Sequence, residues 1–208
     1  MEFRQTIQTV LPERAALSLA ESFARDRGIA LESHASVEAL LRAPVAELGV
    51  VLLDVGAGGE EEVFQTLERL AKRAPVVVLA ESPNLRSVVR WMQAGAASVL
   101  EKPVAREELE SELEVALRRD AEEREVRRHE EELQARFATL TEGEEQVLEQ
   151  LVTGLANKNI AADMQIGLRT VELRRSKILK KTGARSLAEL VRLALIAHPG
   201  WLHHPPRH

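Results

Sequence analysis

The sequence contains no cysteine, and that absence excludes several classes of site. Without thiols the chain can hold neither a disulfide framework nor a thiolate metal site, and it cannot use a cysteine nucleophile. No apolar run approaches the ~20 residues that a membrane-spanning helix needs. The opening residues, MEFRQTIQTV, have neither the apolar stretch nor the cleavage site of a signal peptide. We therefore expect a cytoplasmic protein that has no membrane partner.

The chain has enough apolar residues for two domains, and its charge is unevenly distributed. Its 208 residues are 45% hydrophobic and carry a net charge of -5, and this length allows two separate cores. Residues 104–136 hold 12 acids and 7 arginines, whereas Lys and Arg outnumber Asp and Glu in residues 137–208. The positive excess in the last segment suits a polyanionic partner.

Four short helices are predicted between Leu140 and Ala197. Their limits are marked by capping boxes, which satisfy free N–H groups at a helix start, and by glycines that turn the chain out of a helix. These markers are Thr141 with Glu144, Gly154, Gly183, and Ser186 with Glu189. They predict helices from Glu142, from Asn157 and over residues 168–182, and a fourth helix after Ser186. Two short helices, a tight turn and a basic helix are typical of a helix-turn-helix DNA-binding protein.

The predicted helix over residues 168–182 has an apolar side and a polar side. Steps of 100° per residue place Val171, Ile178 and Thr182 together, away from the charged positions. Between Gly154 and Arg185 there are eight Lys or Arg and two acids. A basic run alone is often a solvated helix face, but docking into DNA requires positive charge at this place in the pattern. We predict that double-stranded DNA is contacted by Lys158, Arg169, Thr170, Glu172, Leu173, Ser176, Lys177 and Lys180.

This segment resembles the LuxR-type DNA-binding domain that closes regulators of the NarL/FixJ family. The matches are Leu140-Thr141, Glu144, Val147-Leu148, Gly154, Asn157-Lys158, Ile160-Ala161, Thr170-Val171, Ile178-Leu179, Lys181, Gly183 and Leu187. Gly143 departs from the usual Arg, Arg174 from a frequent His, and Thr182 from Leu or Met. Of these, Thr182 predicts a looser core under the third helix. The resemblance implies a homodimer joined by the fourth helix. Its apolar stripe, which could equally be core, includes Leu187, Leu190 and Val191.

Residues 5–103 alternate short apolar strands with amphipathic helices, which indicates a parallel sheet covered on both faces. The predicted strands are Thr6–Val10, Ile29–Ser33, Gly49–Asp54, Pro75–Ala80 and Ser98–Leu100. The predicted helices span residues 12–27, 36–43, 60–73 and 84–94, with a fifth from about Ala105. We expect a five-stranded flavodoxin-like (CheY-like) α/β domain with its site at the carboxyl ends of the strands.

At that edge the sequence resembles the receiver domain of two-component response regulators. Asp54 closes the third strand and Lys102-Pro103 follows the fifth, matching the phosphoacceptor Asp and the Lys-Pro pair of the family. In the family, two further acids after the first strand help to hold Mg²⁺. This chain has Leu11-Pro12 at those two places, and Glu13 comes one position late.

Two more family positions are altered, and the chemistry of the receiver is expected to be lost with them. Ala80 stands where a Ser or Thr would donate a hydrogen bond to the phosphoryl group, and Val99 stands where an aromatic residue is usual. We interpret Asp54 and Lys102 as vestigial and expect no cofactor. The alternative is that Asp54 still accepts a phosphoryl group with the help of Glu13.

The sequence divides into four parts, and one tryptophan in the first part has two readings. The parts are a receiver-like domain (1–105), a helical linker that continues the fifth helix (106–136), the LuxR-type domain (137–198) and a flexible tail (199–208). The tail has irregularly spaced histidines among prolines, so a metal site is not expected.

Trp91, on the predicted helix 84–94, is either an exposed anchor of a dimer interface or a core residue.

These patterns favour a sequence-specific DNA-binding transcriptional regulator of the response-regulator type that works without phosphorylation. It would act through dimerisation or through a protein partner, such as a kinase, at the receiver. One alternative is a phosphorylation-dependent two-component response regulator that uses Asp54. Another is a protein-interaction module, which would not need the basic third helix. An enzyme is not expected, because the chain lacks a predicted carboxylate cluster.

Overall fold

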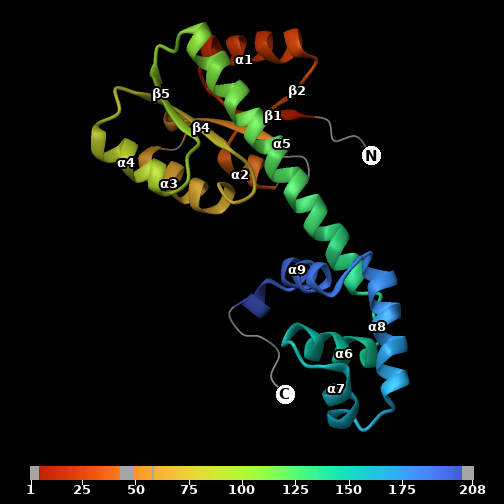
Figure 1. Ribbon diagram of the computed structural model, residues 1–208. Helices are drawn as coiled ribbons and strands as arrows, with labels where there is room; N and C mark the ends of the chain where they lie inside the picture. Colours follow the sequence, from red (N-terminus) through yellow and green to blue (C-terminus); the bar gives the residue numbers. More distant parts are fainter. Residues whose placement is uncertain (1–4, 43–48, 58, 203–208) are drawn as a thin grey trace. The chain divides into compact units, whose positions relative to one another are not determined.

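The structure is a computed structural model that describes residues 5–42, 49–57 and 59–202, and it begins with a parallel five-stranded sheet (Figure 1). The strands are β1 (Thr6–Val10), β2 (Ala30–Ser33), β3 (Val50–Asp54), β4 (Val76–Glu81) and β5 (Ser98–Lys102), in the order β2-β1-β3-β4-β5. A 3-10 turn, η2 (Val55–Ala57), follows β3. The predicted α/β fold class is confirmed, and all five predicted strands are present.

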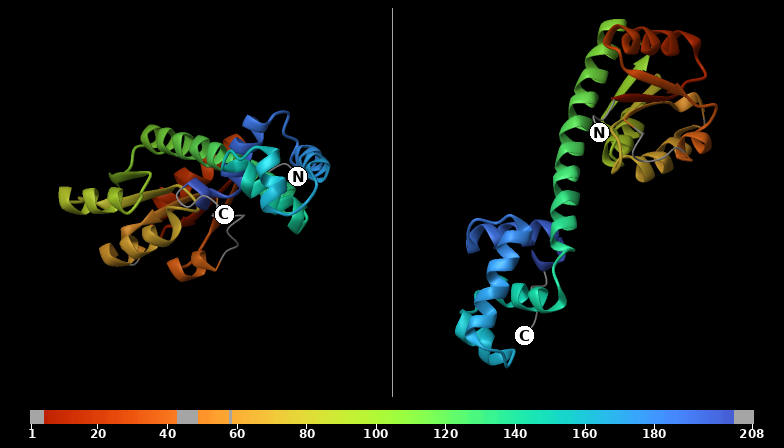
Figure 2. Two further views of the ribbon diagram at one scale, coloured as in Figure 1. Left: turned by 60° about the horizontal axis from the view of Figure 1, so that its bottom comes forward. Right: turned by 90° about the vertical axis from the view of Figure 1, so that its right-hand side faces the viewer.

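Helices cover both faces of this sheet, as the two views of Figure 2 show. One face carries α1 (Arg14–Arg27) and the first half of α5 (Arg106–Phe137), and the other carries α2 (Val37–Leu41), α3 (Gly59–Leu70) and α4 (Leu85–Gln93). The central strand β3 is buried along its whole length because its side chains alternate between the two layers. Val50 and Leu52 join the α1/α5 layer, whereas Val51 and Leu53 join the other. Continuous apolar runs therefore mark the strands that are covered on both sides.

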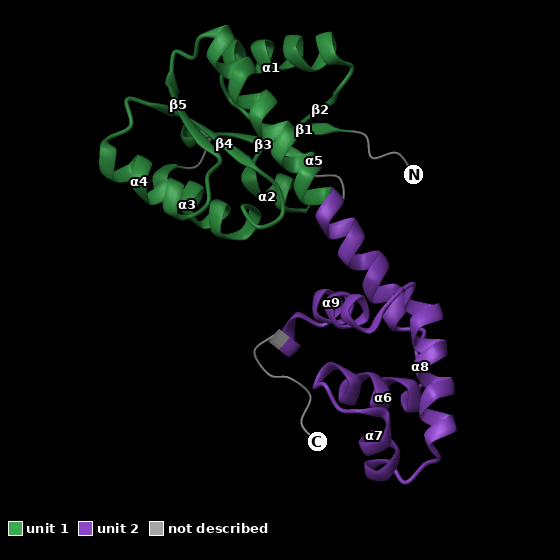
Figure 3. Ribbon diagram, in the orientation of Figure 1, with its two compact units in different colours: residues 1–124 green, residues 125–208 purple. Residues whose placement is uncertain are grey.

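The chain forms two compact units, residues 1–124 and residues 125–208 (Figure 3). The boundary lies inside α5, so the segment interpreted as a linker is one helix that contributes to both cores. Leu109 and Leu113 pack in the first unit, while Leu133 and Phe137 pack in the second. Among the residues that the structure describes, none of the helices is both long and apolar enough to cross a membrane.

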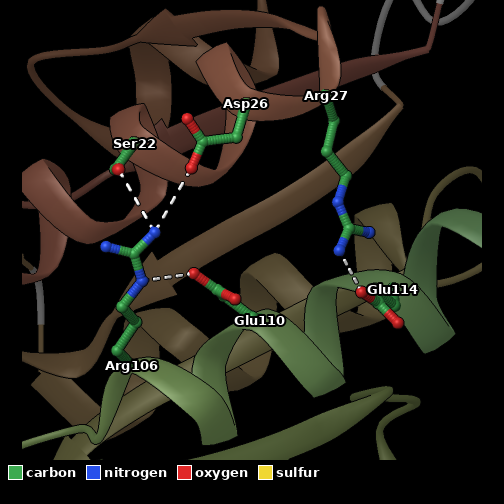
Figure 4. A network of polar contacts seen from close by, with 6 residues as sticks. All are labelled: Ser22, Asp26, Arg27, Arg106, Glu110 and Glu114. Atoms are coloured by element: carbon green, nitrogen blue, oxygen red, sulfur yellow. Dashed lines mark hydrogen bonds and ion pairs between the residues drawn. The ribbon is translucent and has the colours of Figure 1, made fainter.

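Ion pairs on the surface also join the start of α5 to α1 (Figure 4). Arg106 pairs with Asp26 and Arg27 pairs with Glu114 between the two helices, and Arg106 also pairs with Glu110 within α5. All of these side chains remain substantially exposed to solvent, and an exposed pair contributes only about 0–1 kcal/mol. The apolar stripe of α5, rather than these pairs, therefore supplies most of its attachment to the first unit.

Trp91 lies in the core of the first unit, with 1% of its surface exposed. It packs in the same apolar layer as Val63 and Leu67 of α3, and its Nε1–H donates to the carbonyl of Glu60 over 3.5 Å. The ring has no exposed face to offer to a second molecule. Of the two readings of the sequence, the core reading is confirmed, and the hypothesis that Trp91 anchors a dimer interface is wrong.

The second unit contains the four predicted helices and the end of α5. These helices are α6 (Glu142–Val152), α7 (Asn157–Asp163), α8 (Leu168–Thr182) and α9 (Leu187–Ala197). Val171, Ile178 and Thr182 are the buried residues of α8, as the 100° periodicity predicted. Thr182 does not leave a polar atom unpaired, because its hydroxyl donates to the carbonyl of Ile178 over 2.8 Å.

A short turn follows α9 where the sequence suggested a flexible tail. Residues Pro199–Leu202 form the 3-10 turn η3, and Trp201 stacks on His198 with 4.4 Å between the ring centroids. His198 in turn meets Phe137 edge-on at 5.7 Å. The first four residues of the predicted tail are therefore ordered against the second unit, while residues 203–208 lie outside the described part of the chain.

Glu144 is a buried acid that joins α6 to α8. Its Oε2 accepts the N–H of Thr141 over 2.9 Å, which completes the predicted capping box. The same oxygen accepts from Lys181 Nζ over 2.6 Å, and Nζ also donates to the carbonyl of Thr139 over 2.9 Å. The hydrogen bond from Lys181, followed by that from Thr141, holds the pKa of the Glu144 carboxyl below its usual 4.5, although burial opposes this shift.

We predict that Trp91→Ala lowers the free energy of unfolding of the first unit by about 3–5 kcal/mol, because it leaves a large cavity in a packed layer. Urea unfolding monitored by circular dichroism measures this loss. Met92→Ala is the matched control, since Met92 is 45% exposed on the same helix, and its effect should stay within about 0.5 kcal/mol. A Trp91→Ala variant that is as stable as wild type would contradict the packing role of Trp91.

We predict that Glu144→Gln destabilises the second unit by about 1–3 kcal/mol at pH 7, because the charge-assisted bonds to Lys181 and Thr141 weaken. The folded pKa lies below the unfolded one. The stabilisation is therefore present above pH 4.5 and is lost as pH falls through the folded pKa. Unfolding followed by Trp201 emission in a Trp91→Phe background should show a weaker loss on acidification for the variant than for wild type. Glu145→Gln, an exposed neighbour, is the control, and equal behaviour of the two variants would contradict the prediction.

Candidate functional site

Asp54 and Lys102 meet at the carboxyl edge of the sheet, where the sequence placed them. Asp54 ends β3 and is completely buried. Lys102 ends β5, and its Nζ donates to both carboxylate oxygens of Asp54, over 3.1 Å to Oδ1 and 3.0 Å to Oδ2. The N–H of Gly56 donates to Oδ1 over 2.8 Å. Both oxygens of the acceptor-like carboxylate are therefore engaged within the protein.

Two further carboxylates approach the ammonium group of Lys102. Glu13, the residue before α1, reaches back so that its Oε2 lies 3.4 Å from Nζ, and Oε1 of Glu81 lies 3.5 Å from Nζ. Burial acts to lower the pKa of Lys102, but the bonds and charge of Asp54, and then of Glu13, outweigh it and raise that pKa above 10.5. Lys102 thus remains a fixed cation among three acids.

The residues at this edge do not fit the Mg²⁺ of the receiver family. Mg²⁺ requires oxygen ligands in near-octahedral geometry, but Leu11 and Pro12 stand in place of two acids, and the Lys102 ammonium covers the oxygens of Asp54. Within the described ranges, no group of three or more His, Cys, Asp or Glu is arranged to hold a metal ion. Ala80, which is buried at the end of β4, offers no hydroxyl to a phosphoryl group.

The helix beside this edge, α4, is fastened to α3 by polar contacts as well as by Trp91. The hydroxyl of Ser87 lies 3.0 Å from each carboxylate oxygen of Glu60. Arg90 pairs with Glu61 over 2.9 Å, and its guanidinium lies 4.0 Å from the ring centroid of Phe64. These contacts join α4 to α3 beside the buried Trp91, although the exposed Arg90–Glu61 pair contributes little.

A second candidate site is the outer face of α8 together with the start of α7. Every residue predicted to contact DNA is exposed, and the exposed fraction of Leu173 is 54%. Lys158 lies in the first turn of α7, which packs against α8. On α8 the exposed residues are Arg169, Thr170, Glu172, Leu173, Ser176, Lys177 and Lys180. The structure therefore gathers an open surface of net positive charge on a helix whose opposite side is buried.

The basic run on α8 and its neighbours separates into two groups that the sequence did not distinguish. Three of its members are used inside the unit: Arg174 Nη1 donates to the carbonyl of Gly143 over 3.2 Å, Arg175 Nη1 donates to Asn157 Oδ1 over 3.5 Å, and Lys181 binds Glu144. The other five are exposed: Lys158, Arg169, Lys177, Lys180 and Arg185. Helical spacing from Val171 and Ile178 was the signal that could have identified Arg174 and Arg175 as inward-facing.

The predicted dimer residues of α9 differ in exposure. Leu190 is completely buried in the core of the second unit, whereas Leu187 and Val191 are half-buried. Leu190 is therefore a core residue of the helix and has no surface for a second molecule. Leu187 and Val191 lie one turn apart, so they form a short apolar ridge on α9.

Comparisons with known proteins agree with both halves of this architecture. The family described as "Bacterial regulatory proteins, luxR family" matches residues 138–194. The transcriptional regulatory protein FixJ of Azorhizobium caulinodans is 38% identical over 173 residues, which cover 82% of each chain. FixJ of Rhizobium meliloti is 37% identical over 177 residues, covering 81% of this chain and 84% of that protein.

A solved structure shows the same arrangement of elements. The response regulator StyR has a TM-score of 0.77 and 29% sequence identity, with 92% of this chain and 98% of that chain covered. Its likeness and that of the FixJ proteins extend over the parallel sheet as well as over the helix-turn-helix unit. The chain therefore belongs to the FixJ family of response regulators, DNA-binding transcriptional regulators that combine a receiver-like domain with a LuxR-type helix-turn-helix domain.

Proposed function

We propose that this response regulator recognises a specific DNA sequence through α8 and does so without phosphorylation of Asp54. The position of Lys102 is the observation that supports a function without phosphorylation of Asp54. Its ammonium bonds both oxygens of Asp54 while Leu11 and Pro12 replace the acids that would hold Mg²⁺. Asp54 and Lys102 then serve as an internal ion pair rather than as a phosphorylation site.

Charge explains why phosphorylation is disfavoured here. Phosphoryl transfer depends on cations that neutralise the charge developing on the phosphoryl oxygens. The single charge of Lys102 is already shared among Asp54, Glu13 and Glu81. Ala80 supplies no hydrogen bond, and the contacts between α3 and α4 oppose a rearrangement. A phosphoryl group would add negative charge to a site that already has an acidic excess.

A phosphorylation-dependent regulator is the second candidate, and one observation favours it. Glu13 does reach the site, since its carboxylate lies 3.4 Å from Lys102 Nζ. If Lys102 turned away from Asp54, Glu13 and Asp54 would together offer two carboxylates to a cation. This candidate needs Asp54 to exchange its partner, which costs the pairing of a completely buried charge.

Two roles are proposed for the exposed residues of the DNA-binding face. Lys158, Lys177 and Lys180 bind phosphates, which gives affinity without sequence preference. Glu172, Leu173 and Ser176, near the N-terminal half of α8, read base edges, as this part of a recognition helix does. Carboxylates such as that of Glu172 accept from the exocyclic amine of cytosine, and an apolar side chain such as Leu173 contacts the methyl group of thymine.

The proposed assembly is a homodimer on DNA, with no enzymatic activity of its own. The half-buried ridge of Leu187 and Val191 on α9 is the proposed contact between copies. A dimer places two copies of α8 about 34 Å apart, so the site is an inverted repeat. The receiver-like domain then acts through dimerisation or through a protein partner, such as a kinase. The proposed location is the cytoplasm, where the protein has access to DNA. A protein-interaction module alone would leave the exposed basic face of α8 without a role.

We predict that acetyl phosphate or beryllofluoride, each with Mg²⁺, leaves the mass, the oligomeric state and the DNA affinity of the protein unchanged. The physical reason is that Lys102 bonds both carboxylate oxygens of Asp54, while Leu11 and Pro12 replace the acids that would help to hold Mg²⁺. Intact mass spectrometry, sedimentation and gel shifts measure the three quantities, with Asp54→Asn as the control that has no acceptor. A stable aspartyl phosphate on Asp54 would establish the second candidate.

We predict that Glu172→Ala and Lys180→Ala change DNA binding in different ways. Glu172→Ala should alter the preferred base at one position of each half-site, with a change in discrimination of about 1–3 kcal/mol. Lys180→Ala should weaken all sequences alike and reduce the salt slope by about one unit. Selection from random duplexes, followed by affinity measurements at several salt concentrations, separates these effects. A Glu172→Ala variant with an unaltered preferred site, or a wild-type protein with no preferred site, would contradict the assignment of α8.

A further inference from the structure

Gly143, the second residue of α6, lies against the guanidinium group of Arg174 on α8. A Cβ atom added to Gly143 would stand 2.9 Å from Cζ, 2.9 Å from Nη2 and 3.0 Å from Nη1 of Arg174. Cβ atoms in proteins essentially never lie closer than 3.0 Å to another heavy atom, and here three atoms of the guanidinium lie at or below that distance. Only glycine leaves the space that the planar group occupies.

The same guanidinium is held there by a hydrogen bond. Nη1 of Arg174 donates to the carbonyl oxygen of Gly143 over 3.2 Å. Arg174 lies three residues after Val171 and four before Ile178, so it leaves α8 on the side of the buried residues. It is half-buried, and its guanidinium thus forms a polar link between the middle of α8 and the first turn of α6.

The link is made at the turn of α8 that carries the proposed base contacts. Leu173 is the residue before Arg174, Ser176 follows two positions later, and both are exposed on the other side of the helix. A small rotation or shift of α8 at this turn therefore moves the base-reading side chains directly. Base recognition depends on hydrogen-bond geometry within a few tenths of an ångström, so it is sensitive to such a shift.

We propose that Arg174 is a positioning residue for sequence recognition and that Gly143 provides the space in which it acts. This inference rests on the proposed function of α8 as the base-reading helix. Arg174 sets the orientation of α8 on α6 and does not itself read a base. Gly143 and Arg174 form a single functional pair, so breaking either member of the pair breaks the same contact.

The substitution Gly143→Ala separates positioning from charge and from folding. The clashing atoms are the far end of a long side chain, so the guanidinium swings away and the fold is kept. Alanine is also a better helix former than glycine, which favours α6. The number of positive charges is unchanged, so affinity for non-specific DNA stays the same. Only the placement of α8 is altered.

The test uses the full chain with two duplexes: the duplex selected by the wild-type protein from random sequences, and a scrambled duplex of equal length. The variants are Gly143→Ala, Arg174→Ala and the double variant, with Gln146→Ala, an exposed uncharged position on α6, as the matched control. For Gly143→Ala the ratio of the two affinities should fall about five- to tenfold, while affinity for the scrambled duplex and the thermal midpoint are maintained. Arg174→Ala should lower the ratio to a similar extent, and the double variant should resemble Arg174→Ala. Gln146→Ala should resemble wild type.

Several results would overturn the inference. An unchanged affinity ratio in Gly143→Ala would exclude a positioning role, and so would a loss of both affinities in proportion to the unfolded fraction. The two residues act independently if the affinity ratio of the double variant is lower than that of Arg174→Ala by the whole factor that Gly143→Ala causes alone. That result would also contradict the inference. If Gly143→Ala does not fold, an unchanged ratio in Arg174→Ala overturns the inference in its place. If the wild-type protein selects no duplex, base reading by α8 fails first, and this inference fails with it.

Discussion

Asp54 is a carboxylate without solvent contact at the end of the central strand, and such a group is strongly unfavourable unless it is paired and hydrogen-bonded. Its partner comes from β5, two strands away in the sheet order, with Gly56 supplying an additional N–H. The pair therefore depends on β3, β4 and β5 being in register. The stabilisation is mutual, because the half-buried ammonium of Lys102 remains charged among the three carboxylates that surround it. The same constraint that stabilises the edge of the sheet occupies the atoms that a phosphoryl group and a metal ion would need.

The second unit has a similar buried ion pair, which lies where α6 meets α8. Glu144 is nearly as buried as Asp54, and it too is satisfied by a lysine and a backbone N–H. This pair fixes one end of α8, while Arg174 fixes the middle of it against the start of α6. The outer face of α8 is left to exposed cations and to Leu173 and Ser176. A helix-turn-helix unit needs this division, because a recognition helix must be rigidly held on one side and open on the other.

Departures from the family pattern have local physical explanations here. Gly143 and Arg174, which were separate anomalies in the sequence, touch each other in the structure. Thr182 was expected to loosen the core, but its hydroxyl is satisfied by the carbonyl one turn earlier. At the receiver edge, Leu11, Pro12 and Ala80 each lack the polar group that the family has at that position.

The sequence by itself determined the elements and the fold class. Strand runs such as VVLL, the capping box of Thr141 and Glu144, and the spacing of Val171 and Ile178 predicted where strands and helices lie, because these signals depend on hydrogen bonds and periodicity within a few residues. The partner of each side chain was decided only by tertiary structure. Nothing local distinguishes Trp91 in a core from Trp91 at an interface. Helical spacing indicates that Arg174 faces inward, but it does not identify Gly143 as the partner. Those outcomes depend on which helix covers which face and on the space left there, since burial and pairing energies arise between residues that are distant in sequence and meet only after the elements have packed.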